Sequence, residues 1–289
     1  MTNITFIGTG VMGQGIIKNF LKAGHGVHIY TRTKEKAAPL VALGATWYDS
    51  AQAASAQGDI IFTMVGYPKD VEEVYFGDSG IFKAAQPGKI VVDMTTSQPA
   101  LAKKIADYAS SVGMEALDAP VSGGDIGAQN GTLSIMAGGN QAAFEKVYPL
   151  FEVIGQNIRL QGAAGSGQHT KMCNQIAIAT NMIGVCESIA YGKKAGLDMD
   201  SVLASISTGA AGSWSLSNLA PRMLKGDKAP GFYIMHMIKD MGIALEEAKR
   251  MDLQLPGLEM AKAMYDELSA RGYALNGTQA LIDWYEHKK

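Results

Sequence analysis

The sequence predicts an α/β protein in which a doubly wound parallel sheet is followed by an all-helical domain, the two joined by one long helix. Three observations predict this architecture. Short apolar runs alternate with helix-like stretches through the first half of the chain, a glycine-rich turn directly follows the first run, and beyond Gly196 only helical patterns remain. We place the boundary so that the domains cover residues 1–163 and 164–289.

The composition fits ordinary globular domains and excludes several classes of partner. The chain has 289 residues, of which 47% are hydrophobic and 18% charged, and its formal net charge is −2. Near-neutral charge without basic runs argues against nucleic acid or an anionic membrane as the main partner. Because no basic segment followed by an apolar one opens the chain, we expect no secretory signal and a cytoplasmic location. The histidines and cysteines lack metal-binding spacing, so we predict no metal.

The first apolar run, residues 4–7, predicts a strand, and residues 14–23 have the apolar spacing of a helix. The turn between them reads Gly-x-Gly-x-x-Gly, and a second strand is expected at residues 27–30. In this context the first glycine makes the turn, the second lets a pyrophosphate approach, and the third lets the helix pack on the strand. An ordinary glycine-rich turn is the alternative. The candidate cofactor residues here are Gly8, Thr9, Gly10, Val11, Met12 and Gly13.

The second predicted strand ends in Thr31, Arg32 and Thr33, where NAD-binding proteins carry an acidic residue for the ribose hydroxyls. A carboxylate would repel a 2′-phosphate, whereas the planar guanidinium of Arg32 can bind one. The sequence therefore favours NADP(H) over NAD(H). The alternative is that Arg32 is a solvated charge, or stacks on the adenine while either cofactor binds.

The alternation of strands and helices continues to residue 160. We expect strands at residues 45–47, 60–65, 90–94, 115–118, 134–137 and 158–160, and helices at residues 35–43, 50–56, 69–76, 99–110 and 141–151. Ligands of such a sheet lie beyond the carboxyl ends of its strands. Residues 65–68 and 95–97 lie at the carboxyl ends of two of these strands. Met64 and Val65 at the first end and Thr96 at the second are therefore candidate cofactor contacts.

A further candidate site is Ser122, Gly123 and Gly124, which follow the strand expected at residues 115–118. They offer one hydroxyl and two unobstructed backbone amides, an arrangement that suits a small carboxylate. The alternative is a tight turn.

Paired glycines open the predicted long helix at Gly165 and Gly196 ends it, with no proline between. Lys171 and Asn174 are three residues apart near its start and therefore share a face. The uncharged stretch 172–186 is shorter than a membrane span, so we interpret the helix as buried, packed by its own domain and by a second subunit. We expect its two cysteines, at positions 173 and 186, to be reduced thiols of the core.

The remainder of the chain reads as helices separated by glycines and prolines. These helices are expected at residues 201–208, 213–224, 233–251, 258–271 and 278–287.

Four motifs, taken together and in this order, resemble those of the β-hydroxyacid dehydrogenases, the family of 3-hydroxyisobutyrate dehydrogenase, tartronate semialdehyde reductase and the glyoxylate or succinic semialdehyde reductases. The motifs are Gly8-x-Gly10-x-x-Gly13 with Asn19, Asp118 to Gly124 with Gly131 to Leu133, Gly165-x-Gly167 to Lys171 with Asn174, and Lys239-Asp240 with Ala244. The resemblance covers almost the whole chain. It implies an N-terminal Rossmann domain, a helical C-terminal domain and a catalytic site in the cleft between them.

The resemblance also implies roles for individual residues. Lys171 would be the catalytic acid/base, Asn174 would hold the substrate beside it, and Lys239 would reach the cofactor. The remaining substrate contacts would be Ser122, Gly123, Gly124, Thr96, Phe232 and Asp240. Arg32 resembles the members that use NADP(H), which favours reduction of an aldehyde or 2-oxo acid such as glyoxylate over the catabolic dehydrogenase role. A homodimer or homotetramer is expected.

Hydride transfer to a carbonyl leaves charge on its oxygen, so the site needs a proton donor, and Lys171 meets that need. Several alternatives stay open at this point. Lys171 could be a salt-bridged structural lysine, Asn174 a satisfied buried amide, and Lys239-Asp240 a surface pair. A catalytically silent dinucleotide-binding scaffold or sensor is the rival from another class. Imine-reducing relatives would have exchanged the lysine, and 6-phosphogluconate dehydrogenases have a larger helical domain.

Overall fold

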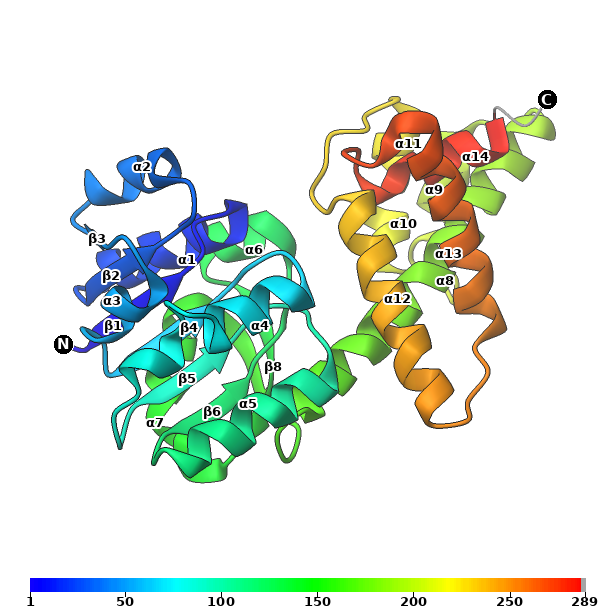
Figure 1. Ribbon diagram of the computed structural model, residues 1–289. Coiled ribbons are helices and arrows are strands. Elements are labelled where there is room, and N and C mark those ends of the chain that lie inside the picture. Colours follow the sequence, from blue (N-terminus) through cyan, green and yellow to red (C-terminus); the bar gives the residue numbers. More distant parts are fainter. Residues whose placement is uncertain (287–289) are drawn as a thin grey trace. The chain divides into compact units, whose positions relative to one another are not determined.

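The computed structural model describes residues 1–286 and divides into two compact units, Met1–Lys171 and a second unit from Met172 onward. The division falls inside the long helix α8 (Ser166–Lys194). The last residue of the helix predicted at 278–287 lies outside the described residues. The predicted combination of a parallel α/β domain with a helical domain is confirmed (Figure 1).

The first unit is built on one sheet with the strand order β3-β2-β1-β4-β5-β6-β8-β7, with β9 paired to β8. Strands β1 to β6 are mutually parallel, and β8 runs antiparallel to β6 and β7. The bounds are β1 Asn3–Ile7, β2 Gly26–Tyr30, β3 Thr46–Trp47, β4 Ile60–Thr63, β5 Ile90–Asp93, β6 Glu115–Asp118, β7 Val121–Ser122, β8 Leu133–Gly139 and β9 Gly155–Leu160. The strand order reverses between β1 and β4, which is where such sheets bind ligands.

Helices cover both faces of this sheet (Figure 1). They are α1 (Val11–Lys22), α2 (Ala38–Val41), α3 (Ala51–Ser55), α4 (Pro68–Phe76), α5 (Pro99–Ser111), α6 (Gly124–Asn130) and α7 (Gln141–Ile154). The single helix predicted at residues 35–43 is instead a 3₁₀ turn, Lys34–Ala37, followed by the short α2.

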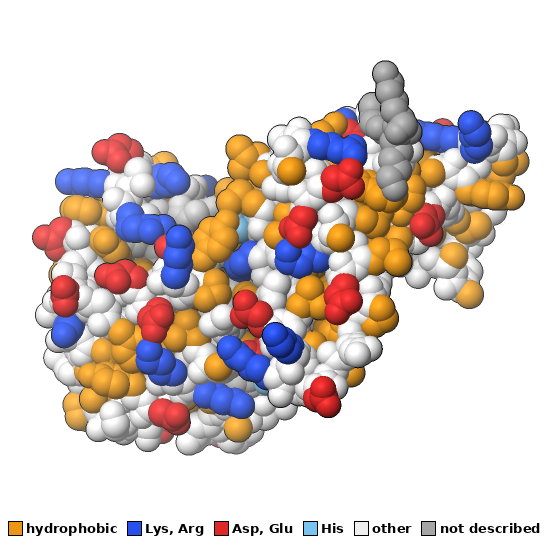
Figure 2. Space-filling model, turned by 45° about the vertical axis from the view of Figure 1, so that its right-hand side comes forward, with side chains coloured by type: hydrophobic (Ala, Val, Ile, Leu, Met, Phe, Trp, Pro, Cys, Tyr) orange, Lys and Arg blue, Asp and Glu red, His pale blue; other side chains and the backbone are white. Residues whose placement is uncertain are grey.

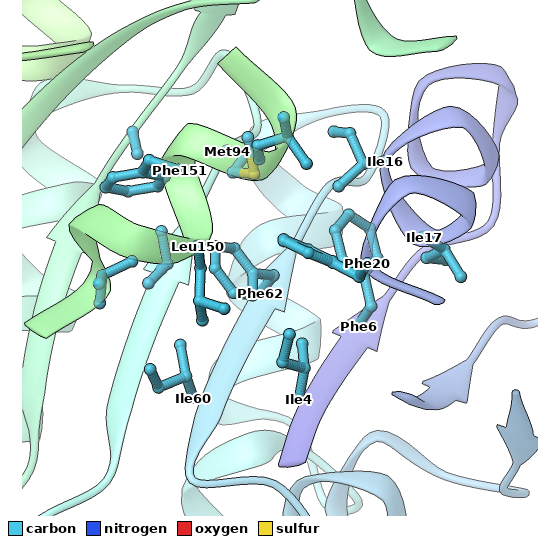
Figure 3. Packing of buried hydrophobic residues seen from close by; sticks show 14 of the residues in the cluster. Ile4, Phe6, Ile16, Ile17, Phe20, Ile60, Phe62, Met94, Leu150 and Phe151 are labelled. Carbon is cyan, nitrogen blue, oxygen red and sulfur yellow. The ribbon is translucent and has the colours of Figure 1, made fainter. Parts of the chain in front are cut away.

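Strand side chains alternate between two apolar clusters, as the two-residue period of a strand requires. Phe6 and Phe62 lie in one cluster with residues of α1 and α7, whereas Ile7 and Ile61 lie in the other with residues of α3, α4 and α5. Figure 3 shows the first cluster, in which Phe20 of α1 packs against Phe62, with ring centroids 5.2 Å apart. The sheet is therefore buried on both faces. A ligand site is expected at the carboxyl ends of its strands.

Helix α6 was not predicted, because its sequence contains two glycines and has weak helix propensity. Contacts with α1 stabilise it instead. A Cβ on Gly15 would lie 2.9 Å from the Ala128 carbonyl carbon, so the helices approach closely. Asn19 Nδ2 donates to the Ala128 carbonyl oxygen at 2.8 Å. Asn19, known from the sequence only as part of a motif, thus ties α1, the helix after the glycine turn, to the helix that follows Ser122.

The second unit is helical and encloses its own core of methionine, leucine and isoleucine side chains around the buried Tyr265. Besides the rest of α8, its helices are α9 (Met199–Ile206), α10 (Trp214–Asn218), α11 (Ala220–Leu224), α12 (Ile234–Arg250), α13 (Pro256–Leu268) and α14 (Ile282–Glu286). The helix predicted at 213–224 is broken at Leu219, and the one predicted from residue 258 begins at Pro256. No helix among the described residues is long and apolar enough to cross a membrane.

Helix α8 has an exposed side in the single chain. From the sequence we expected it to be packed on all sides, in part by a second subunit. Cys186 is in the core, where burial raises the pKa of its thiol, but Cys173 is exposed. Expecting both to be core thiols was therefore wrong for Cys173. Elsewhere the surface mixes charges of both signs, as the face drawn in Figure 2 shows. That mixture agrees with the near-neutral net charge.

Candidate active site

The glycine-rich turn lies at the carboxyl end of β1, and its glycines fall into two kinds. Gly8 has φ +105°, and a Cβ there would lie 2.1 Å from the Met64 carbonyl oxygen. A Cβ on Gly13 would lie 2.2 Å from the Gly8 carbonyl oxygen. A Cβ on Gly10 would have no atom of the described residues within 4 Å. Gly8 and Gly13 are therefore required by packing, whereas Gly10 leaves open space at the start of α1.

These residues fit the pyrophosphate of a dinucleotide. Gly10 is the N-cap of α1 and provides no side-chain cap, so backbone amides at the helix start remain for an anion. Thr9 Oγ1 is buried without a hydrogen-bond partner among the described residues. Such an orphaned hydroxyl beside an open helix start is explained by a bound polar ligand.

At the end of β2, an acidic residue from a distant part of the chain lies beside Arg32. Arg32 is exposed, and its Nη1 lies 3.0 Å from Oδ1 of Asp70 in the first turn of α4. The other oxygen of Asp70 accepts the Tyr67 N–H at 3.1 Å. Asp70 lies 38 residues beyond Arg32, so no local pattern could have predicted the pair. The guanidinium is thereby anchored through one nitrogen beside Thr31 and Thr33.

The loops after β4 and β5 are tied together through Thr95, whose Oγ1 accepts the Val65 N–H at 3.0 Å. Met64, Val65 and Thr96 are all half-buried at this edge of the sheet, and their contact with a cofactor stays a prediction. Beneath them is a buried network, in which Asp93 Oδ1 accepts from Thr63 Oγ1 at 2.8 Å and from Thr95 N at 3.1 Å. The loop geometry therefore depends on a buried carboxyl group.

Burial raises the pKa of Asp93 to about 6, although hydrogen bonds from Thr63 and Thr95 act in the opposite direction. The folded protein therefore holds the proton of the Asp93 carboxyl group more tightly than the unfolded chain does. The contribution of this proton to the free energy of unfolding is fully present below pH about 4. It is lost as pH rises through about 6. A shift of this size corresponds to about 3 kcal/mol.

We therefore expect Asp93→Asn to gain stability relative to the wild type as the pH rises from 4 to 7.5, by up to about 3 kcal/mol. Urea unfolding of both proteins at several pH values measures this difference. Asp107→Asn, at an exposed position of α5, is the matched control and should show no such trend. A variant-minus-wild-type difference that is constant with pH would contradict the assignment.

Ser122, Gly123 and Gly124 lie where β7 passes into α6. Ser122 pairs with Ser134 of β8, and both glycines have positive φ, +128° and +63°. Ser122 and Gly124 are half-buried, and Gly123 is exposed. The backbone there does turn in a way that requires glycine, and binding of a carboxylate stays a prediction.

The start of α8 is held against the sheet by the buried carboxylate of Asp118 at the end of β6. Its Oδ1 accepts the Gly165 N–H at 2.7 Å, and its Oδ2 accepts the Gln168 N–H at 2.8 Å. Burial nevertheless raises the pKa of Asp118. Lys171, one turn further along α8, is 6% exposed. The predicted acid/base is therefore a buried lysine on a helix start that is fixed to the carboxyl edge of the sheet.

In the second unit, Asn174 belongs to a chain of polar groups. Its Nδ2 donates to Gln175 Oε1 at 2.7 Å, and Gln175 Nε2 donates to Asp240 Oδ2 at 2.6 Å. Lys239 Nζ lies 2.9 Å from Asp240 Oδ1, and these side chains are only 11% and 1% exposed. Asp240 is buried and Lys239 half-buried, so the two are not a surface pair. Since Asp240 already holds two partners, its predicted substrate contact stays a prediction.

Phe232 is 37% exposed at the loop before α12, with its ring 6.2 Å from that of His236. Burial, followed by the charge of Lys239, lowers the pKa of His236. The predicted contact of Phe232 with the substrate is not tested by these contacts. Among residues 1–286, no three histidine, cysteine or acidic side chains are grouped as metal ligands.

Two buried polar residues of α8, Gln168 and Gln175, were not singled out from the sequence. With Lys171 they lie at positions i, i+3 and i+7, which is one face of a helix. That spacing of polar groups on an otherwise apolar helix was the available signal.

The chain matches two family models. The model for the NAD binding domain of 6-phosphogluconate dehydrogenase covers residues 3–162, and the model for the NAD-binding of NADP-dependent 3-hydroxyisobutyrate dehydrogenase covers residues 165–285. A probable 3-hydroxyisobutyrate dehydrogenase-like protein of Arabidopsis thaliana is 47% identical, over 97% of this chain and 84% of the relative. The 2-hydroxy-3-oxopropionate reductase of Escherichia coli is 41% identical, over 97% of this chain and 96% of the relative.

Among solved structures, 3-hydroxyisobutyrate dehydrogenase of Mycobacterium tuberculosis with L-serine has a TM-score of 0.90 and 30% identity, over 98% of both chains. The fold and these matches define an oxidoreductase with a nicotinamide-dinucleotide-binding Rossmann domain. The chain belongs to the β-hydroxyacid dehydrogenase family.

Proposed function

We propose that the protein uses NADPH to reduce a small aldehyde or 2-oxo acid that carries a carboxylate, and catalyses the reverse oxidation of the hydroxy acid. The observation that carries this proposal is the place of Lys171, a buried lysine near the start of α8, which Asp118 fixes to the carboxyl edge of the sheet through the Gly165 and Gln168 amides. A sensor or scaffold that only binds a dinucleotide has no need of a buried amine at that place.

When bound, the nicotinamide supplies a hydride to the carbonyl carbon. In this proposal Lys171 donates a proton to the carbonyl oxygen as charge develops there, and Asn174, three residues along α8, holds the substrate. The ammonium form of a lysine predominates at neutral pH, since its ordinary pKa is about 10.4. In the oxidative direction the amine acts as the base. Ser122, Gly123 and Gly124 bind the substrate carboxylate through the hydroxyl and the backbone amides.

The names of the relatives support this substrate class. The bacterial reductase is named for 2-hydroxy-3-oxopropionate, and the mycobacterial enzyme for 3-hydroxyisobutyrate. Both compounds are small acids: the first has an aldehyde that can accept a hydride, and the second has a hydroxyl whose carbon can give one up to an oxidised nicotinamide. We infer the same general chemistry for this chain.

The test is oxidation of NADPH and NADH at pH 7 with glyoxylate, succinic semialdehyde, tartronate semialdehyde and methylmalonate semialdehyde. We expect turnover with at least one of them and a preference for NADPH. If NADPH binds and nothing turns over in either direction, the sensor or scaffold becomes the better account.

We expect Arg32→Ala to raise the KM for NADPH about 10- to 100-fold while leaving that for NADH within about threefold, because charge-assisted hydrogen bonds contribute about 1.5–3 kcal/mol. Steady-state kinetics with both cofactors measures this. Lys36→Ala, which removes a charge from a neighbouring exposed position, is the matched control. Equal losses in the two variants, or an equal loss for NADH, would show that Arg32 does not bind the 2′-phosphate.

We also propose a homodimer or homotetramer in which a second copy covers the exposed side of α8. Cys173, Ala177, Gly184 and Tyr191 are exposed along that helix at spacings of four and seven residues. Light scattering at micromolar concentration tests the assembly, and a monomer would contradict it.

A further inference from the structure

Gln168, in the first turn of α8, is fully buried and uses both ends of its side-chain amide. Its Oε1 accepts the Ser97 N–H at 2.9 Å, and its Nε2 donates to the Thr95 carbonyl oxygen at 2.7 Å. A single side chain therefore holds the backbone immediately before and immediately after Thr96.

The backbone of Gln168 is fixed as well, because its N–H donates to Asp118 Oδ2 at 2.8 Å. Thr95 is in turn bonded to Val65 and Asp93. The loop that carries Thr96 and the helix that carries Lys171 are thus connected through Gln168, three residues before the lysine.

We propose that Gln168 is a positioning residue that fixes Thr96 relative to Lys171. The inference rests on the proposed function, in which Thr96 contacts cofactor and substrate and Lys171 transfers the proton. A neutral amide suits the task because it donates and accepts at once. An apolar replacement leaves the Ser97 N–H and the Thr95 carbonyl unpaired in a buried place, so the loop shifts to recover partners. A misplacement of about 1 Å can lower a catalytic rate about 100-fold.

The first test is Gln168→Leu, with Gln161→Leu at an exposed position before α8 as the matched control. We expect kcat to fall about 10- to 100-fold while the KM for NADPH stays within about threefold. Without cofactor, hydrogen exchange at the Ser97 amide should become at least tenfold faster in Gln168→Leu alone. A kcat within threefold of wild type together with unchanged exchange would overturn the proposal.

The second test, Gln168→Glu, remains informative if the leucine variant fails to fold. A protonated carboxyl reproduces the donor and acceptor of the amide, whereas a carboxylate would face the Thr95 carbonyl oxygen. The charged and titratable groups around this position are Asp93 of β5, Asp118 of β6 and Lys171 of α8. Dividing the variant's kcat by that of the wild type at each pH removes the effect of these groups, because they titrate in both proteins.

We expect this ratio to rise at least tenfold as the pH falls and the new carboxyl group takes up a proton. A ratio that does not change with pH would overturn the proposal. If the wild type turns over no substrate of the panel, the proposed function fails. The exchange rate of the Ser97 amide still decides separately whether Gln168 holds the loop.

Discussion

Replacing Lys171 by alanine is expected to lower kcat at pH 7 about 10³-fold, which is within the usual contribution of a general acid. The affinity for NADPH should remain nearly unchanged, because the glycine turn and Arg32 lie on other elements. Lys171 is buried near the start of α8, and its side chain is the proposed source of the proton. Steady-state turnover and fluorescence titration with NADPH measure the two quantities.

Lys171→Arg is the matched control for this prediction. Arginine keeps the positive charge but, with a pKa above about 12, gives up a proton far less readily. We expect it to be almost as inactive as the alanine variant, and we expect a small primary amine in solution to restore part of the activity of the alanine variant. A comparable loss of NADPH binding and turnover in Lys171→Ala would instead make the lysine structural.

The second large effect is a difference between two glycines of the same turn, Gly13 and Gly10, in what an alanine substitution does to stability and to NADPH binding. Gly13→Ala is expected to destabilise the fold by about 3 kcal/mol or more, because its Cβ would lie 2.2 Å from the Gly8 carbonyl oxygen. Gly10→Ala should change the free energy of unfolding by no more than about 1 kcal/mol, since its Cβ meets no described atom within 4 Å. That methyl group would occupy the space proposed for the pyrophosphate, so NADPH binding should weaken at least about tenfold.

Urea unfolding and NADPH titration of both glycine variants decide the matter. We expect Gly10→Ala to lose NADPH binding without losing stability, and Gly13→Ala to lose both. Undiminished NADPH binding by Gly10→Ala would mean that the open space beside α1 does not receive the pyrophosphate.

The strands and the glycine turn could be predicted because their signals are local. An apolar run such as residues 60–63 followed by turn residues suffices to predict a buried strand. Helix α6 could not be predicted, because the Asn19 amide and the contact at Gly15 stabilise it from another part of the chain. The exposure of Cys173 was missed for a similar reason, since an apolar sequence alone does not say which side of α8 packs within its own domain.

The candidate site shows the same limit. A motif predicted that Lys171 belongs to it, and the position of Thr96 after a strand predicted the same for Thr96, but neither predicted what holds these residues. Gln168 bonds to residues more than 70 positions away in the sequence, and Asp70 reaches Arg32 across 38 positions. Such partners become visible only when the sheet brings its carboxyl ends to one edge.

The most direct test of the account follows the hydride itself. NADPH carrying deuterium at C4 of the nicotinamide, on each face in separate runs, is incubated with the best substrate of the panel, and the hydroxy acid is analysed by mass spectrometry. We predict one deuterium on the new carbinol carbon from one of the two labelled faces, and about 10³-fold slower labelling with Lys171→Ala. NADPH that binds tightly yet transfers no deuterium to any member of the panel would contradict the account.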